Sequence, residues 1–191
     1  MSNNVYLLTC HATGSQLLVD AADDPERCLA LVDEGGPRLD HIVTTHQHWD
    51  HVRALVEVAR RTGARTAAGE EDADALPLAP DRRLRHGDRI AFGEISLDVI
   101  HLRGHTPGSV ALAYDDPSGH AHIFTGDSLF PGGVGATGRY PYQSFESLIH
   151  DVEHRVFDVY DDDTWVYPGH GGDTTLGSER PQLREWRARG W

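Results

Sequence analysis

The stretch Thr45-His46-Gln47-His48-Trp49-Asp50-His51 places three histidines and one aspartate within six residues. It lies between an apolar run at Ile42 and Val43 and an apolar-periodic stretch that begins at Val52, a pattern typical of a strand, a short loop and a helix. A loop that leaves a strand end can turn all four side chains toward one cavity, whereas alternate residues of a regular strand face opposite ways. Imidazole and carboxylate ligands together suit zinc, iron or manganese, so the stretch predicts a metal site.

Three further segments place potential ligands just after the end of an expected strand. His105 follows the strand expected at residues 95–102, Asp127 follows 120–125, and His170 follows 165–167. Because the strand ends of a packed sandwich can meet at one edge, these side chains are expected to join the first cluster in one cavity. The alternative is a histidine-rich surface loop without metal, since the chain has 13 histidines, but four converging strand ends favour the metal site.

Length and composition indicate one ordinary globular domain spanning residues 1–191. The hydrophobic fraction of 39% and the charged fraction of 25% are usual for such a domain, and no apolar run approaches the roughly 20 residues of a membrane helix. The first residues lack the basic and apolar regions of a signal peptide, so we expect a cytoplasmic protein with no membrane partner. Cys10 and Cys28 form no CxxC pattern, and a disulfide framework is not expected.

The net charge of −13, from 30 acidic and 17 basic residues, argues against nucleic acid as a partner. The most basic run, residues 82–85, is flanked by aspartates and is interpreted as a solvated loop or helix face. A small-molecule substrate is therefore expected. The sequence leaves the oligomeric state open.

Hydrophobic periodicity predicts strands and helices that alternate along the chain. Helices are expected at residues 25–34, from Val52 to about Gly63 with an apolar stripe at Val52, Leu55, Val56 and Ala59, after a cap at Ser144, and after a cap at Ser178. Strands are expected at residues 5–9, 16–19, 40–45, 64–68, 89–92, 95–102, 110–114, 120–125 and 165–167. This order predicts two mixed sheets packed face to face, with helices covering the outer faces.

Four motifs resemble the metal motifs of the metallo-β-lactamase superfamily, and they cover nearly the whole chain in order. Two of them are most similar to the glyoxalase II (hydroxyacylglutathione hydrolase) branch, here without its C-terminal helical domain. The motifs are His46-Gln47-His48-Trp49-Asp50-His51, Gly104-His105-Thr106-Pro107-Gly108-Ser109, Phe124-Thr125-Gly126-Asp127-Ser128-Leu129-Phe130 and Pro168-Gly169-His170-Gly171.

The resemblance implies a fold of the α/β (α+β) class, a four-layer αββα sandwich. It also implies a centre of two zinc ions, with iron or manganese as alternatives. The implied ligands are His46, His48 and His105 for one ion and Asp50, His51 and His170 for the other, with Asp127 bridging both.

Two segments differ from the family pattern. The family usually has a glycine shortly after the Asp-His pair, where this chain has residues 52–54 without one. In the glyoxalase II branch an arginine follows Gly-x-Gly closely, whereas here the arginine arrives only at Arg139. Arg139, Tyr140 and Tyr142 follow the glycine-rich stretch at residues 132–138, where they either bind substrate or begin the next helix.

The function expected from the sequence is hydrolysis of a thioester, or of a related activated ester, by a metal-bound hydroxide. Asp50 is expected to orient the water and accept its proton. A thiolate leaves unprotonated near neutral pH, whereas an amide nitrogen needs a general acid, and the sequence offers no obvious one. The first alternative is a mononuclear iron persulfide dioxygenase that uses His46, His105 and Asp127. The second is a lactonase or β-lactamase-like hydrolase, and the third is a metal-stabilised scaffold without turnover.

Overall fold

The computed structural model describes residues 3–36, 38–117 and 119–190. The first sheet has the strand order β1-β2-β3-β4-β5. Its first pair is antiparallel and the other three pairs are parallel. The strands are β1 (Tyr6–Thr9), β2 (Gln16–Val19), β3 (Leu39–Thr44), β4 (Arg65–Gly69) and β5 (Arg82–Leu84).

The second sheet has the order β13-β12-β9-β8-β7-β6, and in it only the pair β9 and β12 is parallel among the described residues. Its strands are β6 (Arg89–Phe92), β7 (Ile95–His101), β8 (Val110–Asp115), β9 (Ala121–Gly126), β12 (Trp165–Pro168) and β13 (Thr174–Thr175). The short strands β10 (Leu129–Phe130) and β11 (Gly133–Val134) form a separate hairpin just after β9.

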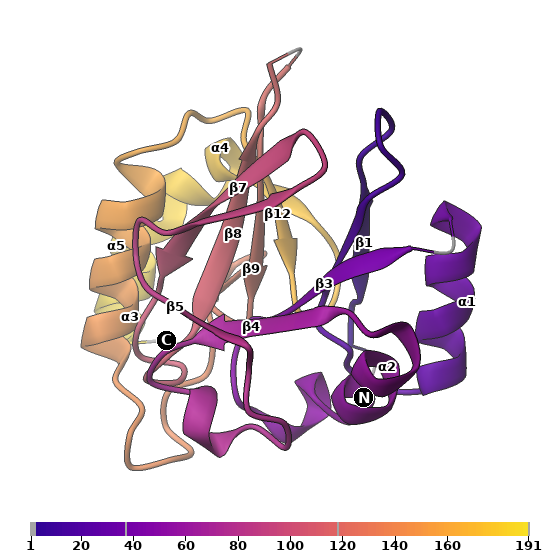
Figure 1. Ribbon diagram of the computed structural model, residues 1–191. Coiled ribbons are helices and arrows are strands. Elements are labelled where there is room, and N and C mark those ends of the chain that lie inside the picture. The colour runs from indigo at the N-terminus through magenta and orange to yellow at the C-terminus, as the bar shows by residue number, and fades with distance from the viewer. Residues whose placement is uncertain (1–2, 37, 118, 191) are drawn as a thin grey trace.

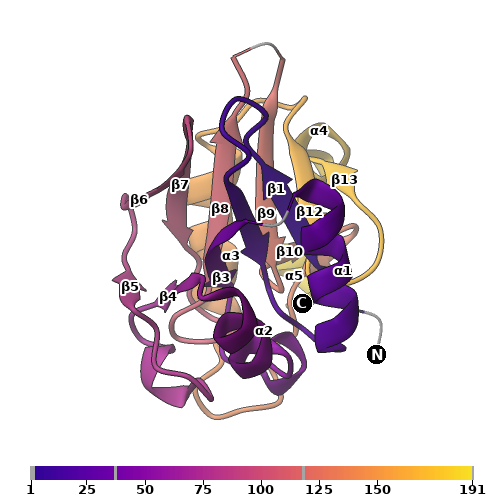
Figure 2. The ribbon, with the colours of Figure 1, turned by 45° about the vertical axis from the view of Figure 1, so that its right-hand side comes forward.

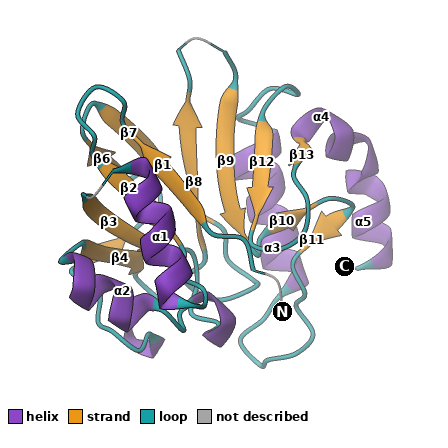
Figure 3. Cartoon of the chain, turned by 90° about the vertical axis from the view of Figure 1, so that its right-hand side faces the viewer, coloured by secondary structure: helices purple, strands orange, loops and turns teal. Residues whose placement is uncertain are grey.

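Helices cover the outer faces of both sheets (Figures 1 and 3). On the first sheet these are α1 (Pro25–Gly35) and α2 (Leu55–Thr62), and on the second they are α3 (Phe145–Val152), α4 (Leu176–Glu179) and α5 (Leu183–Arg189). The apolar side chains form three buried clusters, one between the sheets and one under each helical layer. The predicted αββα sandwich is therefore confirmed. No helix among the described residues is long and apolar enough to cross a bilayer.

Because alternate residues of a strand face opposite sides, β3 contributes side chains to two of these clusters. In β3, Ile42 packs toward α1 and α2 and the next residue, Val43, packs between the sheets. Figure 2 shows β1, β2 and β3 between the helices α1 and α2 and the second sheet. Because β3 is buried on both faces, its direction and its end point are fixed, and the loop after Thr44 starts from a rigid position.

Three details differ from the sequence prediction. The helix after the histidine cluster begins at Leu55 rather than Val52, because the N–H groups of Arg53 and Ala54 donate to the carbonyls of Ala22 and Ala21. Its buried stripe is therefore Leu55, Val58 and Ala59, and Val56 is exposed. Residues 82–84 form the edge strand β5 rather than a loop or helix face. The cap of α4 is Thr175, which accepts a hydrogen bond from the backbone of Ser178.

Candidate metal centre

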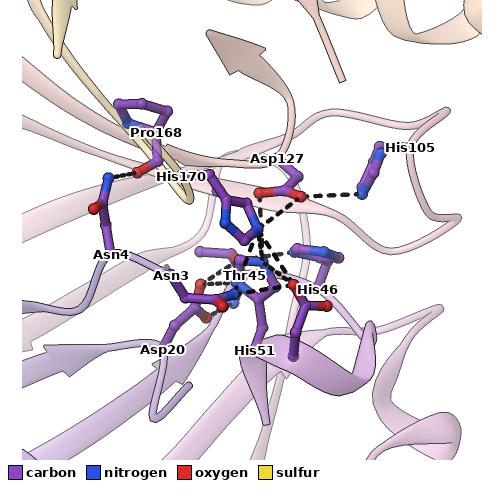
Figure 4. Close-up of polar contacts among 12 residues, drawn as sticks. Asn3, Asn4, Asp20, Thr45, His46, His51, His105, Asp127, Pro168 and His170 are labelled. Atoms are coloured by element: carbon purple, nitrogen blue, oxygen red, sulfur yellow. Dashed lines mark hydrogen bonds and ion pairs between the residues drawn. The ribbon is translucent and has the colours of Figure 1, made fainter. Parts of the chain in front are cut away.

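The four strand ends bring all seven predicted ligands to one edge of the sandwich. Figure 4 shows the imidazole and carboxylate groups of four of them, His46, His51, Asp127 and His170, pointing toward one another, with His105 on the far side of Asp127. Within this cluster, three sets of side chains have ligand atoms that all lie within 4.8 Å of one another. They are His46 with His48 and His105 (the first set), Asp50 with His51 and His170 (the second set), and His46 with His51 and Asp127, which joins the two.

The spacing of the second set matches a tetrahedral metal site. Two ligand atoms that each lie about 2.0–2.1 Å from a zinc ion are about 3.3 Å apart when the geometry is tetrahedral. The Nε2 atoms of His51 and His170 are 3.3 Å apart, and His170 Nε2 lies 3.3 Å from Asp50 Oδ2. His51 Nε2 and Asp50 Oδ2 are 3.8 Å apart, so two of the three separations match the tetrahedral value and the third is wider.

The first set has unpaired nitrogen atoms that a metal would satisfy. The Nε2 atoms of His46 and His105 are buried and have no hydrogen-bond partner among the described residues. A buried polar atom without a partner is costly, so such atoms in a native protein call for a ligand. His48 Nε2 forms a hydrogen bond with the Tyr142 hydroxyl at 3.1 Å, so its Nδ1 remains available to an ion.

Asp127 lies between the two sets. Its Oδ1 is 3.4 Å from His51 Nε2, and its Oδ2 is 3.6 Å from the Nε2 atoms of both His105 and His170. The carboxylate thus contacts ligands of both sets, as a bridging ligand would. The ligand partition implied by the resemblance stays a prediction with which these positions are compatible.

Neighbouring groups fix the orientation of the ligand rings. Asp20 Oδ2 accepts a hydrogen bond from His51 Nδ1 at 2.8 Å, and the same carboxylate accepts from both the N–H and the hydroxyl of Thr45, each at 2.7 Å. Since that hydroxyl donates to Asp20, it accepts from His46 Nδ1 at 3.1 Å. His105 Nδ1 donates to the carbonyl of Ala136 at 2.9 Å. In each case the bond leaves Nε2 free to face the metal.

When no metal is bound, burial determines the protonation state of the three imidazoles of the first set. Burial lowers the pKa of His46 well below its usual value, and nearby histidines lower it further. Burial, helped by the charge of His105, lowers the pKa of His48 to about 4, and burial also lowers the pKa of His105. All three imidazoles are therefore neutral at pH 7, which is the form that binds a metal ion.

His51 and Asp127 titrate differently because they face each other. Burial alone would lower the pKa of His51, but the carboxylates of Asp20 and Asp127 raise it to about 10. Burial alone would raise the pKa of Asp127, but the hydrogen bond and charge of His51 hold it below its usual value. A metal ion that binds here at pH 7 must therefore displace a proton from His51.

Two side chains that the sequence analysis did not select join the ligand loops. Asp72 is fully buried and accepts hydrogen bonds from Gln47 N, Thr106 Oγ1 and Gly108 N at 2.6–2.9 Å. It therefore ties the His46 loop to the His105 loop. On the other side, Asn3 Nδ2 donates to Asp50 Oδ2 at 3.1 Å, so the start of the chain contacts the second set.

Two buried carboxylates of the site, Asp20 and Asp72, were not predicted from the sequence, and each omission has a physical reason. Asp20 directly follows the apolar strand β2, at the same edge of the sheet as the histidines, and this position was the available signal. Its partners lie 25 and 31 residues away, so only the fold reveals the contact. Asp72 sits in an acidic connection with Asp74, and the sequence does not distinguish the buried carboxylate from the exposed one.

The remaining histidine pairs stay outside the centre. His122 Nδ1 bonds with the Tyr167 hydroxyl at 2.9 Å, and His154 Nδ1 donates to Asp158 at 2.7 Å. Among the described residues, neither His120 with His122 nor His150 with His154 is part of a set of three potential ligands. Both pairs therefore lie outside the candidate centre.

Comparison with known proteins finds relatives over most of the chain. The sequence model of the family described as Metallo-beta-lactamase superfamily matches residues 1–186. The chain is 42% identical over 133 residues to a hydroxyacylglutathione hydrolase of Fuscovulum blasticum, covering 70% of this chain and 50% of the relative. It is 28% identical over 181 residues to hydroxyacylglutathione hydrolase GloC of Haemophilus influenzae, covering 85% and 83%. The chain thus spans about half the length of the first relative and most of the second.

Two solved structures have the same fold over most of the chain. ETHE1 from Myxococcus xanthus has a TM-score of 0.82 and 29% identity, covering 94% of this chain and 77% of that one. TTHA1623 in a di-iron-bound form has a TM-score of 0.79 and 34% identity, covering 94% and 92%.

Proposed function

Since the chain belongs to the metallo-β-lactamase superfamily, we propose that it is a hydrolase that holds two metal ions, zinc foremost, and cleaves a thioester. The observation that carries this proposal is the position of Asp127, whose carboxylate lies 3.4–3.6 Å from ligand nitrogens of both sets. The similarity to hydroxyacylglutathione hydrolases supports the reaction class. The di-iron form of TTHA1623 keeps iron as an alternative metal.

The residues of the centre have separate roles in the proposed reaction. Two divalent cations held there would lower the pKa of a bound water and polarise the substrate carbonyl. Asp50 points Oδ2 toward His170 and Asn3, so its Oδ1 is the atom that can orient the water and take its proton. His46, His51 and His105 are held by their second nitrogen atoms, and this keeps the reacting groups in register.

The leaving group explains why a thioester is proposed rather than an amide. An alkyl thiol has a pKa of about 8.5, so its thiolate departs near neutral pH without being protonated first. The three histidines of the first set are neutral and serve as ligands, so they offer no acid to an amide nitrogen. The same reasoning leaves lactones and other activated esters as weaker candidate substrates.

A second candidate is a mononuclear iron persulfide dioxygenase that binds its metal through His46, His105 and Asp127. The similarity to the ETHE1 structure favours it. The second ligand set argues against it, because Asp50, His51 and His170 are already spaced for an ion of their own.

Metal titration tests the proposal directly. Metal-free protein receives zinc in steps while hydrolysis of S-lactoylglutathione and of an acetyl thioester is followed by thiol release. We expect activity to rise up to about two equivalents of zinc per chain. Activity that saturates at one equivalent of iron, with oxygen consumed and no thiol released from a thioester, would instead establish the dioxygenase.

A further inference from the structure

Two stacked tyrosines border the first ligand set. The ring centroids of Tyr140 and Tyr142 are 5.2 Å apart with an interplanar angle of 9°, and the rings remain 38% and 40% exposed. The Tyr142 hydroxyl lies 3.1 Å from His48 Nε2, and the Tyr140 ring lies 5.3 Å from the His48 ring. This tyrosine platform, Tyr140 and Tyr142, is therefore one side chain away from a predicted metal ligand.

Gln143 holds the tyrosine platform in place. Its Oε1 accepts hydrogen bonds from the N–H groups of Arg139 and Tyr140, at 2.8 and 3.0 Å. Its Nε2 donates to the carbonyls of His105 and Ala136, at 2.9 and 3.1 Å. The platform is thus fixed to the same loop that carries His105, and a ligand that stacks on it would not have to order it first.

A third exposed aromatic residue lies between two potential ligands in the chain. Trp49 is 65% exposed, and its chain neighbours His48 and Asp50 belong to the two sets. Leaving such large apolar surfaces in water costs free energy, and apolar patches that persist beside a site mark ligand-binding surfaces. The surface formed by the tyrosine platform therefore suits a substrate with an apolar, flat group.

The charged side chains near the tyrosine platform and the ligands favour a substrate with few carboxylates. Arg139 lies with its guanidinium carbon 5.4 Å from the Tyr140 ring centroid, where it can also meet one carboxylate. Arg53, two residues after His51, is already paired with Asp23 at 3.0 Å. With a net charge of −13, the protein repels polyanions in general.

We propose that the tyrosine platform selects thioesters that carry an aromatic ring, by stacking against that ring. The proposal rests on the proposed function and names its substrate class. The ring can belong to the acyl group or to the thiol, and both sources have the same stacking chemistry. Stacking and the apolar area that the ring buries together should raise kcat/KM about tenfold.

Three thioesters of alkyl thiols separate these sources while the leaving-group chemistry stays similar. They are S-ethyl thioacetate without a ring, the S-ethyl thioester of phenylacetic acid, and S-benzyl thioacetate. We expect at least one of the ring-bearing compounds to exceed the first about tenfold in kcat/KM with the zinc-loaded enzyme. Tyr140→Leu and Tyr142→Leu should bring the ratio close to one, whereas Tyr142→Phe, which keeps the ring, should preserve it.

Trp165→Leu is the matched control. Trp165 is also 40% exposed, but it begins β12, at the end of the strand away from His170. This variant should keep the wild-type ratio. Metal content and the melting temperature of every variant show that the fold and the centre are intact.

Binding without turnover separates the two proposals. Calorimetry compares phenylacetate with acetate on the zinc-loaded protein, and we expect about tenfold tighter binding of phenylacetate, lost in Tyr140→Leu or Tyr142→Leu. Equal binding of the two acids together with no advantage of S-benzyl thioacetate, or a preference that survives both variants, would overturn the aromatic selection. A preference that depends on the tyrosines in a protein that hydrolyses no thioester would support the platform and refute the proposed reaction.

Discussion

Replacing Asp72 with asparagine should loosen the joint between the two loops that carry His46 and His105. Asp72 Oδ1 accepts from Gly108 N at 2.7 Å, and its Oδ2 accepts from Gln47 N at 2.9 Å and from the Thr106 hydroxyl at 2.6 Å. All three partners are donors to a carboxylate. An amide offers only one accepting oxygen, and its NH₂ group must face one of the two backbone N–H groups.

The cost follows from the number of bonds that the amide can keep. The Thr106 hydroxyl can rotate and accept from the NH₂ group, so one backbone N–H loses its partner in either orientation of the amide. A hydrogen bond to a charged group contributes about 1.5–3 kcal/mol, and the neutral side chain is easier to bury, so we expect a net loss of about 2 kcal/mol in the free energy of unfolding. Burial already raises the pKa of Asp72, which agrees with a costly buried charge.

Urea unfolding of the metal-free protein measures this loss. Asp74→Asn is the control, because Asp74 lies two residues away but is exposed and pairs at the surface with Arg83, so its replacement should leave the urea midpoint nearly unchanged. Chelator competition should also show zinc binding weakened about 10- to 100-fold in Asp72→Asn, as is usual when support of a ligand is removed. If Asp72→Asn unfolds at the wild-type urea concentration and binds zinc with wild-type affinity, Asp72 does not join the loops.

Three further predictions concern other parts of the structure. Gly169→Ala should lose metal from the second set, measured by mass spectrometry, because the new Cβ would lie 2.3 Å from Asp127 Oδ1 and 2.7 Å from His51 Cε1; full metal content would contradict this contact. Zinc loading at pH 7 should release a proton from His51, whose pKa is about 10, so the calorimetric heat should depend on the buffer; identical heats in two buffers would count against it. Burial alone would raise the pKa of Asp151, but Arg103 holds it below its usual value, so its contribution to stability is present above roughly pH 4 and is lost as the pH falls further. The stability gap between wild type and Asp151→Asn should therefore be widest at neutral pH and narrow toward pH 3 in urea unfolding, and a constant gap would exclude this pair as its source.

Much of the fold could be predicted because the strands and the amphipathic helices α2 and α3 have clear hydrophobic periods. The strand expected at residues 40–45 and the helix after Ser144 lie where the structure has β3 and α3. Short elements were less predictable. Strands β5, β10 and β11 have only two or three residues, so each is too short for a period and depends on its neighbours for pairing.

The candidate ligands could be predicted because they follow strand ends in sequence, and strand ends meet in space. Their supporting groups could not. Asp20 and Asp72 act through partners 25 to 36 residues away, and their burial arises only when the two sheets pack. Asn3 precedes β1, and it contacts Asp50 in the loop after β3, 47 residues away. No local pattern records contacts of this kind.

Metal content is the most direct test of the central claim that seven side chains hold two ions. Protein purified without added metal is measured by mass spectrometry, together with His48→Ala and His51→Ala, one ligand from each set. We predict about two ions per chain in the wild type, zinc foremost, and a partial loss in each variant. One iron ion per chain, unchanged by His51→Ala, would contradict the two-ion centre and the hydrolase built on it.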